Sequence, residues 1–156
     1  MESFKKSLEI ADEAALAHLA AKIAPTLKKG DIVTLKGGLG AGKTAFARAL
    51  IGALAGASVE VPSPTFTMVQ TYDLPEFLVW HFDLYRLGEK EIDILELGWE
   101  DALRFGVTLV EWPERLGRLL PINRLEIEIT FIKDSENSRR LHIAGGKTWI
   151  DRLGEM

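Results

Sequence analysis

The chain has 156 residues, 47% hydrophobic and 27% charged, and this balance predicts one globular domain over residues 1–156 with no membrane-spanning segment. It contains no cysteine, which excludes disulfide bonds, thiolate metal centres and a cysteine nucleophile. A net charge of −4 disfavours direct, unaided binding to nucleic acid, and the lack of a secretory signal predicts a cytoplasmic location.

The first half of the chain is predicted to form a helix, a strand, a glycine-rich loop and a second helix. Apolar residues recur at helical spacing after Asp12, and the basic turn at residues 28–30 is expected to end this first helix. A short β-branched run at residues 31–36, flanked by glycines, is typical of a buried strand. Residues 43–54 again follow a helical pattern, and Gly56 marks the end of that helix.

The second half is predicted to alternate strands with short helices. Two prolines within residues 61–66 predict an extended loop. Two β-prone runs then flank a turn at residues 73–76 and predict a hairpin. The other predicted elements are strands over 66–72, 77–83, 107–111, 124–132 and 139–144, short helices over 89–97 and 99–104, a helical turn over 113–118, and a helix in the last residues.

Residues 37–44 read Gly-Gly-Leu-Gly-Ala-Gly-Lys-Thr and match the phosphate-binding pattern G-x-x-x-x-G-K-[ST]. Glycines let backbone N–H groups wrap a polyphosphate, while the Lys43 ammonium can reach its β- and γ-phosphates and the Thr44 hydroxyl can bind Mg²⁺. We therefore expect ATP and Mg²⁺ to bind to a P-loop NTPase-like three-layer α/β fold, with a mostly parallel central sheet, antiparallel additions and helices on both faces. The predicted nucleotide-binding residues of the loop are Gly38, Leu39, Gly40, Ala41, Gly42, Lys43 and Thr44.

Two acidic residues end predicted strands, at the edge of a parallel sheet where the phosphate loop also lies. Asp83 ends the strand at 77–83, and Glu111 ends the strand at 107–111. We expect both carboxylates, together with Thr44, to serve the metal site. Thr65 follows a proline, where it can orient water or touch Mg²⁺, although a simple turn into a strand explains it equally well. The predicted catalytic residues are Lys43, Thr65, Asp83 and Glu111.

Two other side chains are close to these acids in the sequence. His81 precedes Asp83 by two residues and shares its face of the predicted strand. It either reaches the site or forms a hydrogen bond in the core, and the core interpretation is favoured. Trp112 follows Glu111, and packing is the usual role of tryptophan, so a contact between Trp112 and a ligand needs a test.

Three further motifs follow the phosphate loop in order. They are Ser-Pro-Thr-Phe at residues 63–66, His-Phe-Asp-Leu-Tyr-Arg at 81–86 and Val-Glu-Trp-Pro-Glu at 110–114. With this order and spacing, the chain resembles the bacterial ATPase family of tRNA threonylcarbamoyladenosine biosynthesis, TsaE, over nearly its whole length. One departure is Gly38, where the family usually has aspartate, so any role of that carboxylate in closing the site has no counterpart here.

The resemblance implies a weak, magnesium-dependent ATPase that works with two paralogous TsaB- and TsaD-like subunits. Those subunits place threonylcarbamoyl on adenosine 37 of tRNAs that read A-starting codons, and this chain would meet tRNA only through the complex. ATP hydrolysis would reset the complex between cycles. By the same resemblance, Thr44 and Glu111 hold Mg²⁺, Asp83 supports catalysis, and Trp112 and Arg140 lie near the nucleotide.

Two other functions remain open from the residues alone. One is a small P-loop kinase for a metabolite, which needs an acceptor pocket and an arginine-bearing lid, but residues 86–104 are too acidic and leucine-rich to make a convincing lid. The other is a nucleotide-dependent binding module whose hydrolysis is incidental. Retained partner function in a Glu111→Ala variant that still binds ATP would support the binding module.

Overall fold

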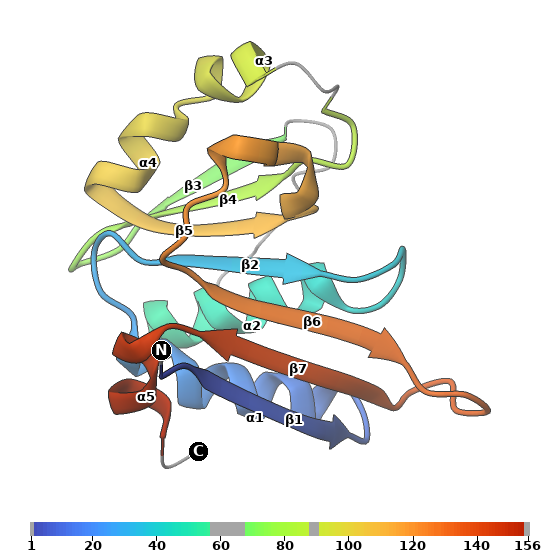
Figure 1. The fold of residues 1–156 in the computed structure, drawn as a ribbon. Coiled ribbons are helices and arrows are strands. Elements are labelled where there is room, and N and C mark those ends of the chain that lie inside the picture. Colours follow the sequence, from blue (N-terminus) through green and yellow to red (C-terminus); the bar gives the residue numbers. More distant parts are fainter. Residues whose placement is uncertain (1, 57–67, 88–90, 155–156) are drawn as a thin grey trace.

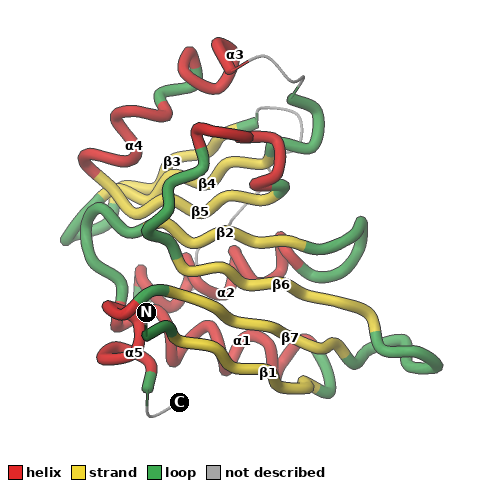
Figure 2. Tube along the Cα trace, in the orientation of Figure 1, coloured by secondary structure: helices red, strands yellow, loops and turns green. Residues whose placement is uncertain are grey.

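The computed structural model describes residues 2–56, 68–87 and 91–154, and their strands form one seven-stranded sheet (Figures 1 and 2). The strand order is β1-β7-β6-β2-β5-β4-β3. The strands are β1 (Phe4–Ile10), β2 (Ile32–Lys36), β3 (Val69–Asp73), β4 (Leu78–Asp83), β5 (Gly106–Glu111), β6 (Leu125–Phe131) and β7 (Arg139–Gly145). The helices are α1 (Glu13–Ile23), α2 (Lys43–Ala55), α3 (Glu91–Glu96), α4 (Trp99–Phe105) and α5 (Lys147–Leu153), with 3₁₀ turns η1 (Ala24–Thr26) and η2 (Pro113–Leu119).

The centre of the sheet is parallel and its two margins are antiparallel. β2 pairs in parallel with β5 and β6, and β5 pairs in parallel with β4. β7 pairs antiparallel with β6 and β1, and β3 pairs antiparallel with β4. The carboxyl ends of β2, β4 and β5 therefore meet at one edge of the sheet, where ligands bind in open α/β folds.

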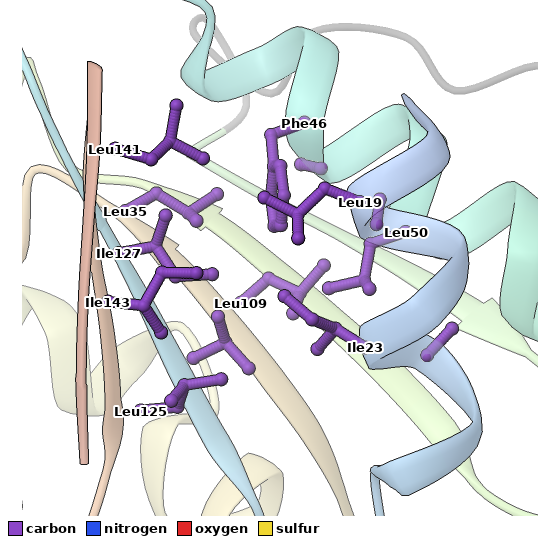
Figure 3. Close-up of a cluster of buried hydrophobic side chains, with 14 of the residues drawn as sticks. Leu19, Ile23, Leu35, Phe46, Leu50, Leu109, Leu125, Ile127, Leu141 and Ile143 are labelled. Atoms are coloured by element: carbon purple, nitrogen blue, oxygen red, sulfur yellow. The ribbon is translucent and has the colours of Figure 1, made fainter. Parts of the chain in front are cut away.

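Helices cover both faces of the sheet (Figure 1). α1, α2 and α5 pack on one face, where apolar side chains of α1 and α2 meet those of the central strands (Figure 3). α3, α4 and η2 pack on the other face, around Phe82 and Trp99. These three layers, with the mostly parallel centre, confirm the predicted fold class. No helix of the described residues has the length and apolar character needed to cross a membrane.

Most predicted elements are confirmed, but the end of the first helix and the start of the hairpin differ. α1 ends at Ile23 instead of continuing to residues 28–30, because Pro25 lacks an N–H and the chain turns into η1. Met68 has a φ of 67°, so the extended backbone of β3 begins only at Val69. The proline-containing loop at 61–66 lies outside the described residues.

Strand β1 is an addition that sequence patterning did not predict. Phe4 and Ile10 at its ends are buried, and its centre carries Lys6, which interrupts the apolar alternation of a half-buried strand. The strand forms because the edge of β7 offers it a complete antiparallel register, from Phe4 opposite Gly145 to Ile10 opposite Arg139. The sequence of this segment alone only weakly predicts a strand, and the pairing with β7 stabilises it.

Candidate nucleotide-binding site

The glycine-rich loop joins the carboxyl end of β2 to the N-terminus of α2. Gly40 and Gly42 have φ angles of 77° and 118°, in the left-handed region that glycine adopts without strain. At Gly37 a Cβ would lie 2.6 Å from the carbonyl oxygen of Ile129 on β6. α2 begins at Lys43 without a side-chain cap or an acid in its first turn, which leaves its first N–H groups for an anion. The backbone thus has the geometry of a phosphate cradle.

A hollow of about 320 Å³ opens beside the loop at the carboxyl edge of the sheet. Four of its polar lining residues belong to three elements: Lys43 and Thr44 begin α2, while Asp83 ends β4 and Glu111 ends β5. Asp83 and Glu111 lie opposite one another in the register of these two strands. The rest of the lining is Leu39, Gly40, Ala41, Gly42, Ala45, Tyr85, Arg86 and Trp112. The structure therefore brings together the loop and both strand-end acids.

The Lys43 side chain is held inside the loop and is only 5% exposed. Its Nζ donates to the carbonyl oxygens of Gly37 at 2.5 Å and Gly38 at 2.9 Å, and lies 4.1 Å from the centre of the Trp112 ring. Burial lowers the pKa of Lys43, while nearby carboxylates, Glu111 foremost, act in the opposite direction. A polyphosphate in the hollow would offer the ammonium charged acceptors, which form stronger hydrogen bonds than carbonyls.

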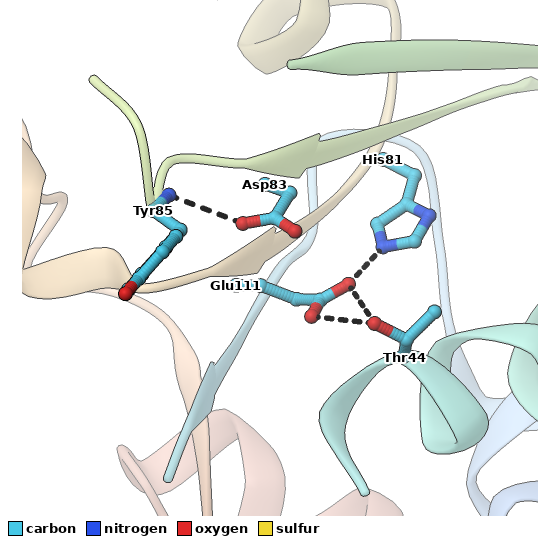
Figure 4. Close-up of polar contacts among 5 residues, drawn as sticks. All are labelled: Thr44, His81, Asp83, Tyr85 and Glu111. Carbon is cyan, nitrogen blue, oxygen red and sulfur yellow. Dashed lines mark hydrogen bonds and ion pairs between the residues drawn. The ribbon is translucent and has the colours of Figure 1, made fainter. Parts of the chain in front are cut away.

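The Glu111 carboxylate is the centre of a polar network in the hollow (Figure 4). Thr44 Oγ1 donates to this carboxylate, at 2.8 Å from Oε1 and 3.1 Å from Oε2. His81 Nε2 lies 2.7 Å from Oε2. Both Glu111 and His81 are buried. His81 is thus buried and hydrogen-bonded, as the core interpretation expected, but its partner is the predicted metal ligand Glu111, so His81 also reaches the site.

Asp83 and the aromatic pair beside it form another wall of the hollow. The buried Asp83 accepts a hydrogen bond from the backbone N–H of Tyr85 at 3.1 Å. The rings of Tyr85 and Trp112 lie 5.0 Å apart between centres. Trp112 has a φ of 60°, unusual for a bulky residue, and this turn after β5 places its indole against Lys43. A contact between Trp112 and a nucleotide stays a prediction.

A second hollow of about 240 Å³ lies against the same loop, next to the start of α1. The residues that line both hollows are Gly40, Ala41, Gly42 and Ala45. The second hollow is otherwise lined by Ile10, Asp12, Glu13, Leu16, Glu136, Asn137 and Arg139. Arg139 Nε donates to the carbonyl oxygen of Ala41 at 3.0 Å, and its guanidinium lies 4.6 Å from the centre of the Phe131 ring. Arg139 therefore ties the β6–β7 hairpin to the phosphate loop.

The structure does not bring Arg140 to the loop. Its guanidinium pairs with Glu9 of β1 at 2.5 Å, and both side chains are about half exposed. Successive residues of a strand face opposite sides of the sheet, so Arg139 shares the face of the buried Leu141 and Arg140 does not. The sequence analysis placed Arg140 and not Arg139 near the nucleotide, although the alternation of residues along β7 assigns Arg139 to the face of Leu141. Thr65 lies outside the described residues.

The oxygen donors of the first hollow fit Mg²⁺. Among the described residues, no group of three or more His, Cys, Asp or Glu side chains is placed to hold a metal ion alone. Mg²⁺ does not need such a cage, because it usually takes one or two carboxylates together with phosphate oxygens and waters. The Thr44 hydroxyl and the carboxylates of Glu111 and Asp83 are hard ligands of that kind. The hollow thus suits a magnesium ion that arrives with a nucleotide.

Comparisons with known proteins found a matching family model and several similar proteins. The family model described as "Threonylcarbamoyl adenosine biosynthesis protein TsaE" matches residues 10–141. The chain is 43% identical over 119 residues to the tRNA threonylcarbamoyladenosine biosynthesis protein TsaE of Rickettsia bellii, covering 76% of this chain and 82% of the relative. It is 37% identical over 134 residues to the protein of the same name from Bacillus subtilis, covering 85% of this chain and 80% of the relative.

A solved structure agrees with these matches. The crystal structure of Bacillus subtilis YdiB is similar with a TM-score of 0.78 and 26% sequence identity, over 99% of this chain and 95% of that chain. The family match spans the phosphate loop, His81, Asp83 and Glu111, which are the residues that form the first hollow and its polar network. The chain belongs to the TsaE family.

Proposed function

We propose that this chain binds ATP and Mg²⁺ in the first hollow and hydrolyses ATP as a subunit of the machinery that makes threonylcarbamoyladenosine in tRNA. The observation that carries the proposal is the convergence of Lys43, Thr44, Asp83 and Glu111 on one hollow beside the phosphate loop. The relatives and the family model support the tRNA part, because they are named for the biosynthesis of that nucleoside.

The phosphates would be held by the backbone N–H groups of residues 38–44 and by Lys43. Lys43 would exchange the carbonyl oxygens of Gly37 and Gly38 for phosphate oxygens, without a large movement of its backbone. The charge-assisted hydrogen bonds formed in this way are roughly twice as strong as neutral ones. The loop is thus able to recognise the polyphosphate and not only the nucleoside.

Thr44 and Glu111 would hold Mg²⁺, and the metal would supply charge neutralisation at the phosphate oxygens when bound. Asp83 faces the same hollow from the neighbouring strand and would orient the attacking water. Its carboxylate accepts a hydrogen bond from the backbone N–H of Tyr85, which orients it at the edge of the hollow.

The second hollow is the proposed nucleoside site. It shares residues of the phosphate loop with the first hollow, so a polyphosphate bound along the loop would reach from one hollow to the other. Ile10 and Leu16 offer an apolar wall for a base, and Asn137 offers an amide for hydrogen bonds. The Arg139 guanidinium stands where the loop meets this hollow and would favour an anionic ligand.

Hydrolysis by the isolated chain is expected to be slow. Neutralisation of transition-state charge by an arginine accelerates related phosphoryl-transfer enzymes by about 10³- to 10⁵-fold. Arg86 lines the first hollow from its exposed rim and is the residue we propose for this role. We propose that the TsaB- and TsaD-like partner subunits, with their tRNA, position Arg86 for this role in the cytoplasm, and that hydrolysis resets the partner complex between cycles.

ATP turnover with Mg²⁺ tests the proposal, first for the chain alone and then with the two partner subunits and tRNA. We expect the full mixture to raise turnover, and Glu111→Gln and Asp83→Asn to lower it by about 10²-fold or more, as losses of electrostatic stabilisation do. Glu128→Gln is the matched control, because Glu128 lies on β6 and does not line the first hollow.

The other outcomes point to other functions. ATP binding without turnover in any mixture would contradict the ATPase and support a nucleotide-dependent binding module. Transfer of the γ-phosphate to a compound in a metabolite panel would instead indicate a kinase.

A further inference from the structure

His81 is a buried imidazole next to the proposed magnesium ligands, and the mechanism above does not use it. It lies on β4, and its side chain is 0% exposed. Its Nε2 contacts Oε2 of Glu111 at 2.7 Å (Figure 4). A carboxylate only accepts hydrogen bonds, so Nε2 carries the hydrogen atom and is the donor of this hydrogen bond. Nδ1 is buried too, and it has no hydrogen-bond partner within the described part of the chain.

Packing alone does not explain a histidine at this position. A buried polar atom without a partner costs about 1–3 kcal/mol of folding free energy. Val79 lies two residues earlier on the same face of β4, is fully buried in the main core cluster and avoids that cost. The contact that offsets the cost at His81 is its hydrogen bond to one oxygen of Glu111.

Glu111 needs more than Thr44 to fix its orientation. The Thr44 hydroxyl lies within 3.1 Å of both carboxylate oxygens, so this contact alone does not select which oxygen faces a metal. His81 contacts Oε2 at 2.7 Å, which distinguishes the two oxygens. Oε1 is then left with the shorter of the two Thr44 contacts, at 2.8 Å. Oε1 and the Thr44 hydroxyl therefore lie side by side, where both can serve as oxygen ligands of one metal ion.

We propose that His81 is a positioning residue for magnesium binding: it holds Oε2 of Glu111 so that Oε1 and the Thr44 hydroxyl face the metal together. The inference rests on the proposed function, because it requires Glu111 and Thr44 to be magnesium ligands. His81 touches neither metal nor nucleotide and acts through Glu111. Loss of a hydrogen-bonding partner of a metal ligand typically weakens metal binding by about 10- to 100-fold.

Metal binding can be measured without turnover. Mn²⁺ replaces Mg²⁺ as a spectroscopic probe, and electron paramagnetic resonance of a titration into the protein–ADP complex gives its dissociation constant. We expect His81→Ala to weaken Mn²⁺ binding by about 10- to 100-fold, while ADP binding in the presence of a chelator stays unchanged. His81→Gln should retain most of the affinity, because its amide nitrogen can donate from nearly the same place as Nε2.

Val79→Ala is the matched control for loss of a buried side chain from β4. It removes core packing and leaves the contacts of Glu111 in place, so it should bind Mn²⁺ as the natural chain does. Thermal unfolding of both variants shows whether each is folded during the titration. A folded His81→Gln variant that binds Mn²⁺ as weakly as His81→Ala would overturn the role of the Nε2 donor.

Glu111→Gln separates this inference from the proposed function. If Glu111→Gln weakens Mn²⁺ binding and the added His81→Ala change weakens it no further, the two residues act as one unit and the proposal is supported. If Glu111→Gln weakens binding but His81→Ala binds like the natural chain, the positioning role is wrong and the metal site stands. If Glu111→Gln also binds like the natural chain, the metal site itself is wrong.

Discussion

The two ends of the central sheet each carry a hollow, and these differ in chemistry more than in size. The hollow at the carboxyl ends of the strands has about 320 Å³ and is lined by Lys43, Thr44, Asp83 and Glu111 among others. The hollow near the end of α2 and the β3–β4 turn has about 400 Å³. Its lining residues are Ala24, Pro25, Leu27, Ala53, Leu54, Leu74, Pro75, Glu76 and Phe77. Of these lining residues Glu76 alone has a charged side chain, so the two hollows differ in charged groups, and volume does not locate the function.

Helix α2 explains why the two ends differ. Its N-terminus at Lys43 has no side-chain cap, so unsatisfied N–H groups and the positive end of the helix dipole lie at the carboxyl edge. At its other end, Gly56 adopts a left-handed conformation and its N–H bonds back to the carbonyl oxygens of Gly52 and Ala53. The N-terminus of α2 is thus open to an anion, whereas the C-terminus is capped by the chain's own backbone.

The largest expected effect on nucleotide binding is that of Lys43→Ala. The ammonium would make two or more charge-assisted hydrogen bonds to phosphate, each contributing about 1.5–3 kcal/mol. Loss of these bonds should weaken ATP binding by about 100-fold or more, as equilibrium titration with a fluorescent ATP analogue would measure. Lys133→Ala, at an exposed position outside both hollows at the loop, is the control. An unchanged dissociation constant for Lys43→Ala would contradict the phosphate site.

A smaller effect is expected from the arginines of β7, which face opposite sides of the sheet. Arg139→Ala removes the guanidinium that contacts the loop at Ala41 and should weaken ATP binding by about tenfold, as loss of one charged contact does. Arg140→Ala is the matched control, since its partner is Glu9, and it should leave ATP binding within twofold. The same titration compares them, and a larger loss for Arg140→Ala would restore the nucleotide contact that the family resemblance implies.

This arginine pair separates the placements that could be predicted from the sequence from those that could not. The motif at residues 37–44 depends on a local backbone shape, so the phosphate loop could be predicted from the sequence alone. The same is true of Asp83 and Glu111, because parallel strands bring their carboxyl ends to one edge. Which of Arg139 and Arg140 reaches the loop depends on the face of β7 to which each belongs, and a shift of one residue along the strand exchanges the two faces.

Contacts between segments that are distant in the sequence could not be predicted from the sequence patterns. The bond between His81 and Glu111 exists because β4 pairs with β5, although α3 and α4 separate these strands along the chain. Strand β1 likewise exists because β7 accepts it, and its own pattern with a central Lys6 does not identify it. Periodicity describes one element at a time, whereas both features depend on which elements become neighbours.

The smallest expected effect on nucleotide binding comes from the opposite end of α2. Leu54→Ala trims a half-buried side chain at the larger hollow and should lower the free energy of unfolding by about 1–2 kcal/mol. Thermal unfolding should show this as a fall in Tm of about 2–8 °C. ATP affinity should stay within twofold, because Leu54 lies near the end of α2, roughly 16 Å along the helix from Lys43. Ile122→Ala, at a position 96% exposed, should change neither quantity. A loss of ATP affinity above about fivefold, near 1 kcal/mol, would instead show that α2 couples the two ends of the sheet.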